Sequence, residues 1–428
     1  MKKACVKKIV IEDRIYIRNE DIEDLAYLES LYTYNTGEEF ITTIECYDEY
    51  VAVPSNSYYK LDWKELEDNR NFDVLDYKIP FSGTLRPEQQ DIVNKFFSKG
   101  RARSGLIQAK PGFGKTFTAA KIISDNNTKT LVLVHTKLLF RQWIEELEKQ
   151  LPNTKIGNIG DGLFDVQDVT IAIYKTAHNN IDIIKDSFSM VIVDESHKCP
   201  ADMFSRVVNG INAKVKIALT ATPRRKDGKH VFLDDFFSQF RVQADDSRDL
   251  PTPSVQIIKT DFKFNVISPK TDWARTLNKL CSDQAYIKFI AEKAISYIKQ
   301  GRCPLILGER VQMLKDIQAL IPNSICVIGS TSEDVRKDAL EHAGTKYSAI
   351  LSTKLFDEGI SCHRLDTLVL TCPSNNSVQW EQRIGRIERL HPDKKHPLVA
   401  DIWLSGNIVN RQQANRLNWY QQRGYYIL

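Results

Sequence analysis

The spacing of apolar residues divides the chain into parts with different predicted structures. In residues 1–80, short stretches in which apolar and polar residues alternate predict strands at 6–17, 40–45 and 50–53. A helical pattern covers residues 21–31 between them. This first part is predicted to form a small α+β domain that ends near the turn at 81–83.

From residue 81 onward, apolar runs typical of buried strands alternate with helical patterns. The candidate strands are 105–109, 130–135, 169–173, 190–194 and 215–220, with helices that include 117–124 and 138–151. Regular β–α alternation predicts a parallel sheet with helices on both faces. The pattern breaks into a linker near residues 249–253.

A second alternating set follows the linker. Helical patterns at 273–280 and 285–300 precede candidate strands at 304–307, 324–328, 349–352, 367–370 and 398–403. The predicted fold class is therefore α/β, with two similar parallel-sheet units in tandem after a small α+β domain. The predicted domain boundaries are 1–80, 81–250 and 251–428.

Charge is distributed unevenly along the 428 residues, although the net charge is only +4. Residues 1–80 hold 10 Lys and Arg against 18 Asp and Glu, whereas the remaining residues hold 49 against 37. A basic main body fits a polyanionic partner. Because solvated basic faces are common, charge alone does not establish such a partner.

Several classes of protein are disfavoured by composition. No apolar run approaches the roughly 20 residues of a membrane span, and the basic N-terminus leads into no apolar signal core. The eight cysteines are scattered with no C-x-x-C pair, which disfavours structural zinc and favours reduced thiols. We therefore expect a cytoplasmic protein; the sequence leaves the oligomeric state open and is compatible with a monomer.

The segment 109–116, Ala-Lys-Pro-Gly-Phe-Gly-Lys-Thr, is typical of a phosphate-binding loop between a strand and a helix. Glycines let the backbone close around a phosphate, and successive amides and the helix N-terminus point at the anion. Lys115 would reach the β and γ phosphates of a nucleoside triphosphate, and the Thr116 hydroxyl would ligate Mg²⁺. The strict pattern has glycine where this chain has Ala109. We assign nucleotide binding to Pro111, Gly112, Phe113, Gly114, Lys115 and Thr116.

An acidic pair follows the apolar strand predicted at 190–194. Asp194 and Glu195 would lie at the carboxyl edge of the sheet, where open α/β sheets bind ligands. Asp194 would hold Mg²⁺, and Glu195 would orient and activate the attacking water. The hydroxyl-rich segment 219–223, at the end of the next strand, would connect this pair to a nucleic-acid-binding face by hydrogen bonds.

An arginine-rich segment in the second unit, 382–389, reads Gln-Arg-Ile-Gly-Arg-Ile-Glu-Arg. Arginines that recur every three residues share one helical face, and a guanidinium suits the charge on a transferred phosphoryl group. Arg386 and Arg389 are therefore candidates to act on the phosphates from the second unit. Gln382 would help to place the nucleotide or the water.

Six motifs in this order resemble those of the superfamily 2 helicases and translocases. They lie at residues 85–90, 109–116, 194–197, 220–222, 353–360 and 382–389. The resemblance implies two RecA-like domains, ATP and Mg²⁺ as cofactors, and ATP hydrolysis stimulated by nucleic acid. It also implies that Arg86 and Gln89 contact adenine and that Asp357 and Gly359 lie near the nucleotide. Glu88 stands where many relatives have tyrosine.

The same resemblance implies contacts with the nucleic-acid backbone. Hydroxyl, lysine and backbone amide groups suit phosphate contact, which positions a protein without reading sequence. The residues at the matching positions are Thr136, Lys137, Lys175, Thr176, Arg310, Ser330 and Thr353.

Within the superfamily, the acidic motif and its spacing resemble the group that contains XPB, RadD, RecG and UvsW. The segment 85–89, the linker with Pro251 and the C-terminal pattern Arg416-x₃-Tyr420-x₃-Gly424-Tyr425 favour the UvsW-type branch. The resemblance implies a phage or viral protein that acts in the host cytoplasm. It further implies 3′ to 5′ movement on DNA and remodelling of Holliday junctions, forks and displaced loops in recombination, repair or replication. Residues 1–80 would recognise duplex or junction shape.

Three other functions fit the same motifs. An RNA helicase would belong to the same enzyme class but act on RNA. A duplex translocase would move along double-stranded DNA without separating its strands. A nucleotide-dependent scaffold without hydrolysis is disfavoured because Lys115, Asp194 and Glu195 are all present.

Overall fold

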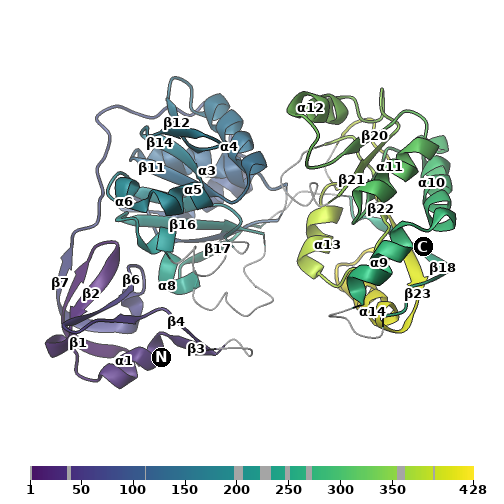
Figure 1. Cartoon of the computed structure of the whole chain (residues 1–428). Helices are drawn as coiled ribbons and strands as arrows, with labels where there is room; N and C mark the ends of the chain where they lie inside the picture. The colour runs from purple at the N-terminus through teal and green to yellow at the C-terminus, as the bar shows by residue number, and fades with distance from the viewer. Residues whose placement is uncertain are drawn as a thin grey trace. The chain divides into compact units, whose positions relative to one another are not determined.

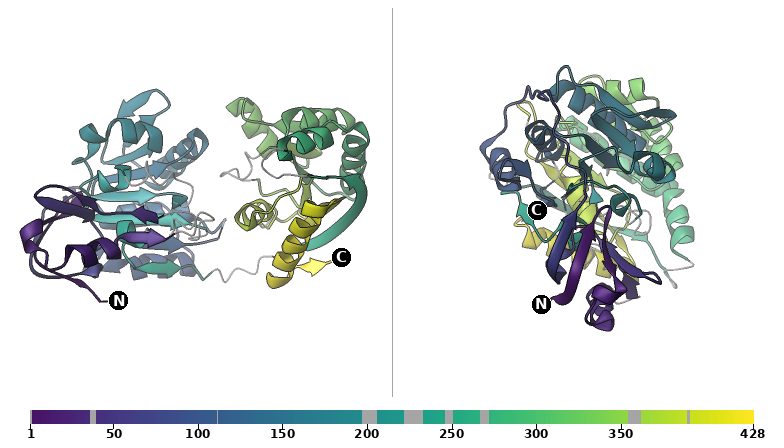
Figure 2. Two further views of the ribbon diagram at one scale, coloured as in Figure 1. Left: turned by 60° about the horizontal axis from the view of Figure 1, so that its bottom comes forward. Right: turned by 90° about the vertical axis from the view of Figure 1, so that its left-hand side faces the viewer.

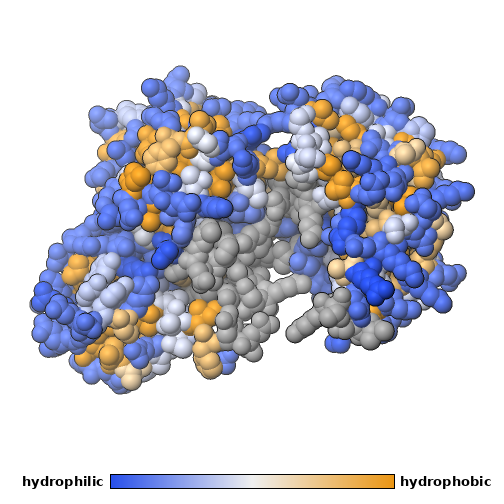
Figure 3. Space-filling view, in the orientation of Figure 1, coloured by the Kyte–Doolittle hydropathy of each residue, from blue (hydrophilic) through white to orange (hydrophobic). Residues whose placement is uncertain are grey.

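The computed structural model describes residues 2–35, 40–110, 112–196, 206–221, 233–245, 251–266, 272–353, 362–388 and 391–428. The chain divides into two compact units, residues 1–247 and 248–428, coloured from purple to teal and from green to yellow in Figure 1. On the face seen in Figure 3, hydrophilic residues cover most of the described surface. None of the described helices is long and apolar enough to cross a membrane.

The first unit begins with a small α+β domain. Its sheet has the order β5-β6-β2-β1-β7, in which β1 and β7 are parallel and the other neighbours antiparallel. The elements are β1 (Ala4–Ile11), β2 (Arg14–Arg18), η1 (Asn19–Asp21), α1 (Leu25–Leu31), β3 (Thr33–Asn35), β4 (Phe40–Thr42), β5 (Glu45–Cys46), β6 (Tyr50–Pro54), η2 (Tyr58–Lys60) and β7 (Leu61–Asp68). Alternate isoleucines of β1 and β2 point into one apolar core.

Three local predictions for this domain need correction. The alternation over 6–17 forms two strands with a turn between them. The helix predicted from residue 21 begins at Leu25, because the Asp24 side chain caps it by accepting from the Tyr27 amide at 2.9 Å. Strand β7 was not predicted because its sequence is mostly polar, and pairing with β1 determines it.

A buried polar cluster attaches this domain to the rest of the first unit. Lys60 Nζ lies 2.7 Å from Asp235 Oδ1, and the two side chains are 3% and 0% exposed. Asp235 belongs to α8 (Leu233–Phe237) and also accepts from the hydroxyls of Tyr34, Thr43 and Tyr59 at 2.5, 3.0 and 2.9 Å. Burial lowers the pKa of Lys60, and the charge of Asp235 opposes that shift. The fully partnered ion pair therefore fixes the domain to α8 (Figure 1).

A second buried contact lies nearby. Lys216 is fully buried, and its Nζ donates to Ser55 Oγ at 2.9 Å and to the Val208 carbonyl at 2.7 Å. Asn56 donates to the Phe236 carbonyl at 2.7 Å. Because these contacts join the small domain to the larger one, the two form one unit, as the views in Figure 2 also show.

An eight-stranded sheet forms the rest of the first unit, in the order β13-β12-β14-β11-β15-β16-β10-β17. Every neighbouring pair is parallel except β12 and β13. Separate apolar cores cover its two faces. The strands are β10 (Gly105–Gln108), β11 (Thr130–Val134), β12 (Ile156–Gly160), β13 (Leu163–Asp165), β14 (Val169–Ile173), β15 (Met190–Val193), β16 (Val215–Thr220) and β17 (Arg241–Gln243). The remaining elements are α2 (Pro87–Phe96), the hairpin of β8 (Phe97–Ser98) and β9 (Arg101–Ala102), α3 (Lys115–Asn126), α4 (Lys137–Gln150), α5 (Tyr174–Asn179) and α6 (Ile181–Ile184).

The second unit contains a seven-stranded parallel sheet in the order β20-β21-β19-β22-β23-β18-β24. Its strands are β18 (Ser254–Lys263), β19 (Pro304–Leu307), β20 (Ser324–Val327), β21 (Ala349–Ser352), β22 (Thr367–Leu370), β23 (Leu398–Ser405) and β24 (Tyr426–Ile427). The helices are α9 (Trp273–Cys281), α10 (Gln284–Lys299), α11 (Val311–Leu320), α12 (Glu333–Glu341), α13 (Ser377–Ile384) and α14 (Asn407–Gln422). These two sheets and the small domain confirm the predicted fold class of two tandem RecA-like domains after an α+β domain.

Candidate functional site

The phosphate-loop candidate connects β10 to α3 at the carboxyl edge of the first sheet. Gly112 and Gly114 have φ of 78° and 91°, in the left-handed region that favours glycine. A Cβ at Gly114 would lie 2.6 Å from Gln89 Nε2, so a side chain here would displace the Gln89 amide and would be strained at this positive φ. Helix α3 begins at Lys115. Pro111 lies outside the described residues.

The acidic candidates lie beside this loop. Lys115 Nζ is 3.1 Å from Glu195 Oε1, and both side chains are largely buried. Glu195 itself has φ of 46°, an uncommon backbone conformation for a residue with a side chain. Asp194 is 5% exposed; burial raises its pKa, the charge of Glu195 adds to the rise, and Lys115 opposes it. The lysine and both carboxylates that the sequence predicts to act together therefore meet in one place.

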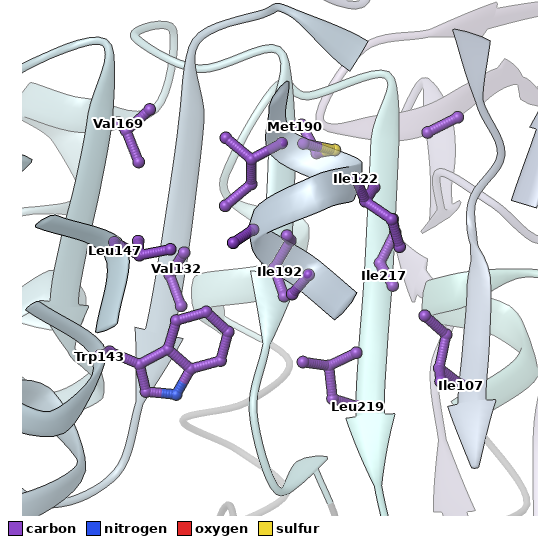
Figure 4. Packing of buried hydrophobic residues seen from close by; sticks show 14 of the residues in the cluster. Ile107, Ile122, Val132, Trp143, Leu147, Val169, Met190, Ile192, Ile217 and Leu219 are labelled. Carbon is purple, nitrogen blue, oxygen red and sulfur yellow. The ribbon is translucent and has the colours of Figure 1, made fainter. Parts of the chain in front are cut away.

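Trp143 of α4 holds the Asp194 carboxylate. Its indole Nε1 donates to Asp194 Oδ2 at 2.9 Å, while Oδ1 accepts from the Glu195 amide at 2.9 Å. The ring lies near Val132 and Leu147 in the apolar core (Figure 4). The sequence does not mark Trp143 as a site residue, because a tryptophan on the apolar face of a helix is typical of a core position.

The segment before α2 contacts the same loop. Arg86 Nη2 and Gln89 Nε2 both donate to the Phe113 carbonyl, at 2.5 and 3.0 Å. The Arg86 guanidinium carbon lies 5.5 Å from the centre of the Phe113 ring and its Nε lies 3.4 Å from Glu88 Oε1. Both adenine-contact candidates are thus next to the phosphate loop.

The oxygen donors at this edge fit a magnesium ion. Mg²⁺ prefers carboxylate, hydroxyl and water oxygens, and Asp194 and Thr116 provide the first two. Each Asp194 oxygen accepts one hydrogen bond from the chain, which leaves lone pairs on a carboxylate whose orientation is fixed.

The nucleic-acid candidates of the first unit follow neighbouring strands of the sheet. Thr136 caps α4 by accepting from the Leu139 amide at 3.2 Å, and Lys137 forms an ion pair with Asp161 at 2.5 Å. Lys175 is exposed and Thr176 partly exposed, at the start of α5. Because β11 and β14 are adjacent and parallel, these residues lie at the same sheet edge.

The corresponding candidates of the second unit follow three neighbouring strands. Arg310, Ser330 and Thr353 come after β19, β20 and β21, which are adjacent and parallel. Arg310 Nε donates to Asn278 Oδ1 at 2.7 Å. These three residues therefore also share one sheet edge.

The arginine-rich segment begins on α13. Gln382 and Arg386 are 6% exposed, and Arg383 Nη2 lies 3.4 Å from Glu309 Oε1. These residues belong to the second unit, whereas the phosphate loop belongs to the first. Arg389, Asp357, Gly359 and the segment 222–223 lie outside the described residues.

Comparisons with known proteins found matching family models and similar proteins. Residues 82–225 match the family described as Type III restriction enzyme, res subunit, and residues 287–391 match the helicase conserved C-terminal domain. "DNA 3'-5' translocase XPB2" of Sulfurisphaera tokodaii is 33% identical over 410 residues, covering 82% of this chain and 89% of that protein. "Probable helicase D10" of Escherichia phage T5 is 28% identical over 327 residues, covering 75% and 72%. The crystal structure of T4 UvsW aligns over 98% of both chains, with a TM-score of 0.40 and 15% identity.

The two family matches lie one in each unit of the fold, and the XPB2 similarity covers more than four fifths of both proteins. A helicase of this kind binds ATP and nucleic acid. The chain therefore belongs to the superfamily 2 helicases and translocases, in the group that contains XPB.

Proposed function

We propose that this helicase is an ATP-driven DNA motor that moves 3′ to 5′ and remodels branched DNA such as Holliday junctions, forks and displaced loops. Such a motor would act in recombination, repair or replication of a phage or virus, inside the host cell. The observation that carries the proposal is the meeting of Lys115, Asp194 and Glu195 at one sheet edge. A cation for the phosphates, a magnesium ligand and a base for water are there together.

In this proposal, Lys115 exchanges partners when ATP binds. Its ammonium now neutralises Glu195 at 3.1 Å; a triphosphate would draw it to the β and γ oxygens. Glu195 would then be free to orient and activate the attacking water. Mg²⁺, held by Thr116 and Asp194, would supply charge neutralisation on the same phosphates.

The second RecA-like domain would complete the site. Gln382, Arg386 and Arg389 would contact the nucleotide when the two domains close on it, because a fixed guanidinium stabilises the charge of phosphoryl transfer. Loss of the γ-phosphate would release these contacts and reopen the cleft. Alternating grip by the sheet-edge residues of the two domains would then produce steps along one strand.

The choice of DNA over RNA is supported by the names of similar proteins. The relative with 33% identity is named a DNA translocase, and RNA remains the second candidate because a mimivirus relative with 24% identity has ATP-dependent RNA helicase in its name. Comparing ATPase stimulation by DNA and RNA oligomers of one sequence tests this choice. Stronger stimulation by RNA would contradict the proposal.

Residues 1–80 would recognise duplex or junction shape through a local basic patch, since the domain as a whole is acidic. A panel of forked, four-way and single-stranded DNA tests this role and the branched preference together. Equal stimulation and strand displacement on all substrates would contradict both. Triplex displacement without unwinding would instead indicate a duplex translocase.

A further inference from the structure

The C-terminal pattern Arg416-x₃-Tyr420-x₃-Gly424-Tyr425 forms a rigid base on the second sheet. Arg416 Nε and Nη2 contact the two oxygens of Asp401 on β23 at 2.7 and 2.6 Å, and both side chains are buried. The Tyr420 hydroxyl donates to Asp401 at 3.1 Å. A bidentate, buried pair of this kind has little rotational freedom, so α14 is firmly attached to the sheet.

The chain reverses direction after α14. Gly424 has φ of 71°, which a glycine adopts without strain. The turn brings the Tyr425 ring back onto Tyr420, with ring centres 5.9 Å apart, and onto Trp419 at 5.7 Å. These aromatic contacts fix the direction of the Tyr425 hydroxyl.

Two side chains that follow α14 contact α13 and the turn after it (α13 and α14 are labelled in Figure 1). Arg423 Nη1 and Nη2 donate to Glu381 Oε1 and Oε2 at 3.0 and 2.9 Å. The Tyr425 hydroxyl donates to Glu388 Oε1 at 3.0 Å. The ring of Trp380 lies 5.8 Å from the ring of Trp419. We call Arg423 and Tyr425 the C-terminal clamp.

The two glutamates that the C-terminal clamp contacts are sequence neighbours of predicted site residues. Glu381 directly precedes Gln382, and Glu388 directly precedes Arg389. Helix α13 ends at Ile384, so Glu381 lies in its last turn and Glu388 lies in the turn that follows the helix. The clamp therefore holds the residue before Gln382 in α13 and the residue two positions after Arg386 in the turn that follows.

We propose that Arg423 and Tyr425 are positioning residues that hold residues 381–388 in the orientation from which Arg386 reaches the transferred phosphate. This inference rests on the proposed function. A misplacement of about 1 Å in a catalytic group can cost on the order of 100-fold in rate. Loss of the clamp should therefore lower kcat while leaving KM for ATP unchanged, because the first domain supplies the main nucleotide-binding groups.

The test is a double-mutant cycle on the full chain. Arg423→Gln and Glu381→Gln should each lower the DNA-stimulated kcat about 10-fold or more, with KM for ATP within about twofold of the unmodified protein. The double variant should be no slower than the slower single variant, because both changes break one contact. Arg411→Gln removes an exposed arginine from α14, the helix that Arg423 follows, and should leave kcat unchanged.

Tyr425→Phe provides an independent variant that removes only the hydroxyl and should also lower kcat without changing KM. A kcat equal to that of the unmodified protein in Arg423→Gln or Glu381→Gln would overturn the clamp, as would losses that add in the double variant. Lys115→Ala, assayed alongside, separates the two ideas. If it is inactive while the clamp variants are fully active, only the clamp fails; if it hydrolyses ATP normally, the proposed function fails.

Discussion

Replacing Trp143 by phenylalanine should slow ATP turnover and raise the Mg²⁺ requirement without unfolding the protein. The indole is 1% exposed and donates to Asp194 Oδ2 at 2.9 Å. A hydrogen bond to an ionised group contributes about 1.5–3 kcal/mol, and about 1.4 kcal/mol corresponds to tenfold in rate or affinity. If the bond orients Asp194 for Mg²⁺, its loss should cost about 10- to 100-fold in kcat or in Mg²⁺ affinity.

Steady-state ATPase assays at varied Mg²⁺ concentration measure both effects. Phe140→Leu is the matched control, because Phe140 lies in the same helix and the same core but carries no donor. Both variants lose buried volume and should lower the melting temperature to a similar extent. Indistinguishable kcat and Mg²⁺ dependence in Trp143→Phe and Phe140→Leu would refute the positioning role of the indole.

Three further predictions concern the first unit. Asp235→Asn leaves Lys60 buried without a compensating charge and should lower the free energy of unfolding by about 3–5 kcal/mol. Chemical denaturation should show that Lys60→Met/Asp235→Asn recovers part of this loss. No recovery in the double variant would contradict the role of the ion pair. Lys216 has its pKa lowered by burial from 10.5 to about 7, so the unfolded chain binds the extra proton between these values and stability should rise with pH across that window. Lys216→Met should therefore reduce the rise in melting temperature from pH 7 to 9.5, and an unchanged slope would contradict the burial effect. Gly114→Ala places a Cβ 2.6 Å from Gln89 Nε2 at a positive φ and should weaken fluorescent nucleotide binding, whereas full affinity would show that the loop adapts.

The fold was predictable wherever local pattern decides structure. Strands β19, β21 and β22 have the predicted bounds, because each is a short, continuously buried apolar run. Strand β18 was not predicted because it directly follows the prolines of the predicted linker and its C-terminal half is mostly polar. Strand β12 was also not predicted, because its two glycines weaken the strand pattern. Strand β18 depends on pairing with β23 and β24, which are distant in sequence.

The candidate site divides in the same way. Lys115, Asp194 and Glu195 are predicted by motifs, because a phosphate-loop pattern and an acidic pair after a strand are local features of the sequence. The indole of Trp143 and the Lys60–Asp235 pair join distant segments, and no local pattern marks such contacts. The pattern that begins at Arg416 was visible in the sequence. Only the structure shows that the clamp residues Arg423 and Tyr425 contact Glu381 and Glu388.

ATP hydrolysis by the unmodified protein, Lys115→Ala and Glu195→Gln, measured with and without forked DNA, decides whether this chain is a DNA-stimulated ATPase that uses these two residues. We expect hydrolysis that DNA accelerates in the unmodified protein and that both substitutions abolish while the fold is retained. DNA-stimulated turnover by Lys115→Ala at the unmodified rate would contradict it.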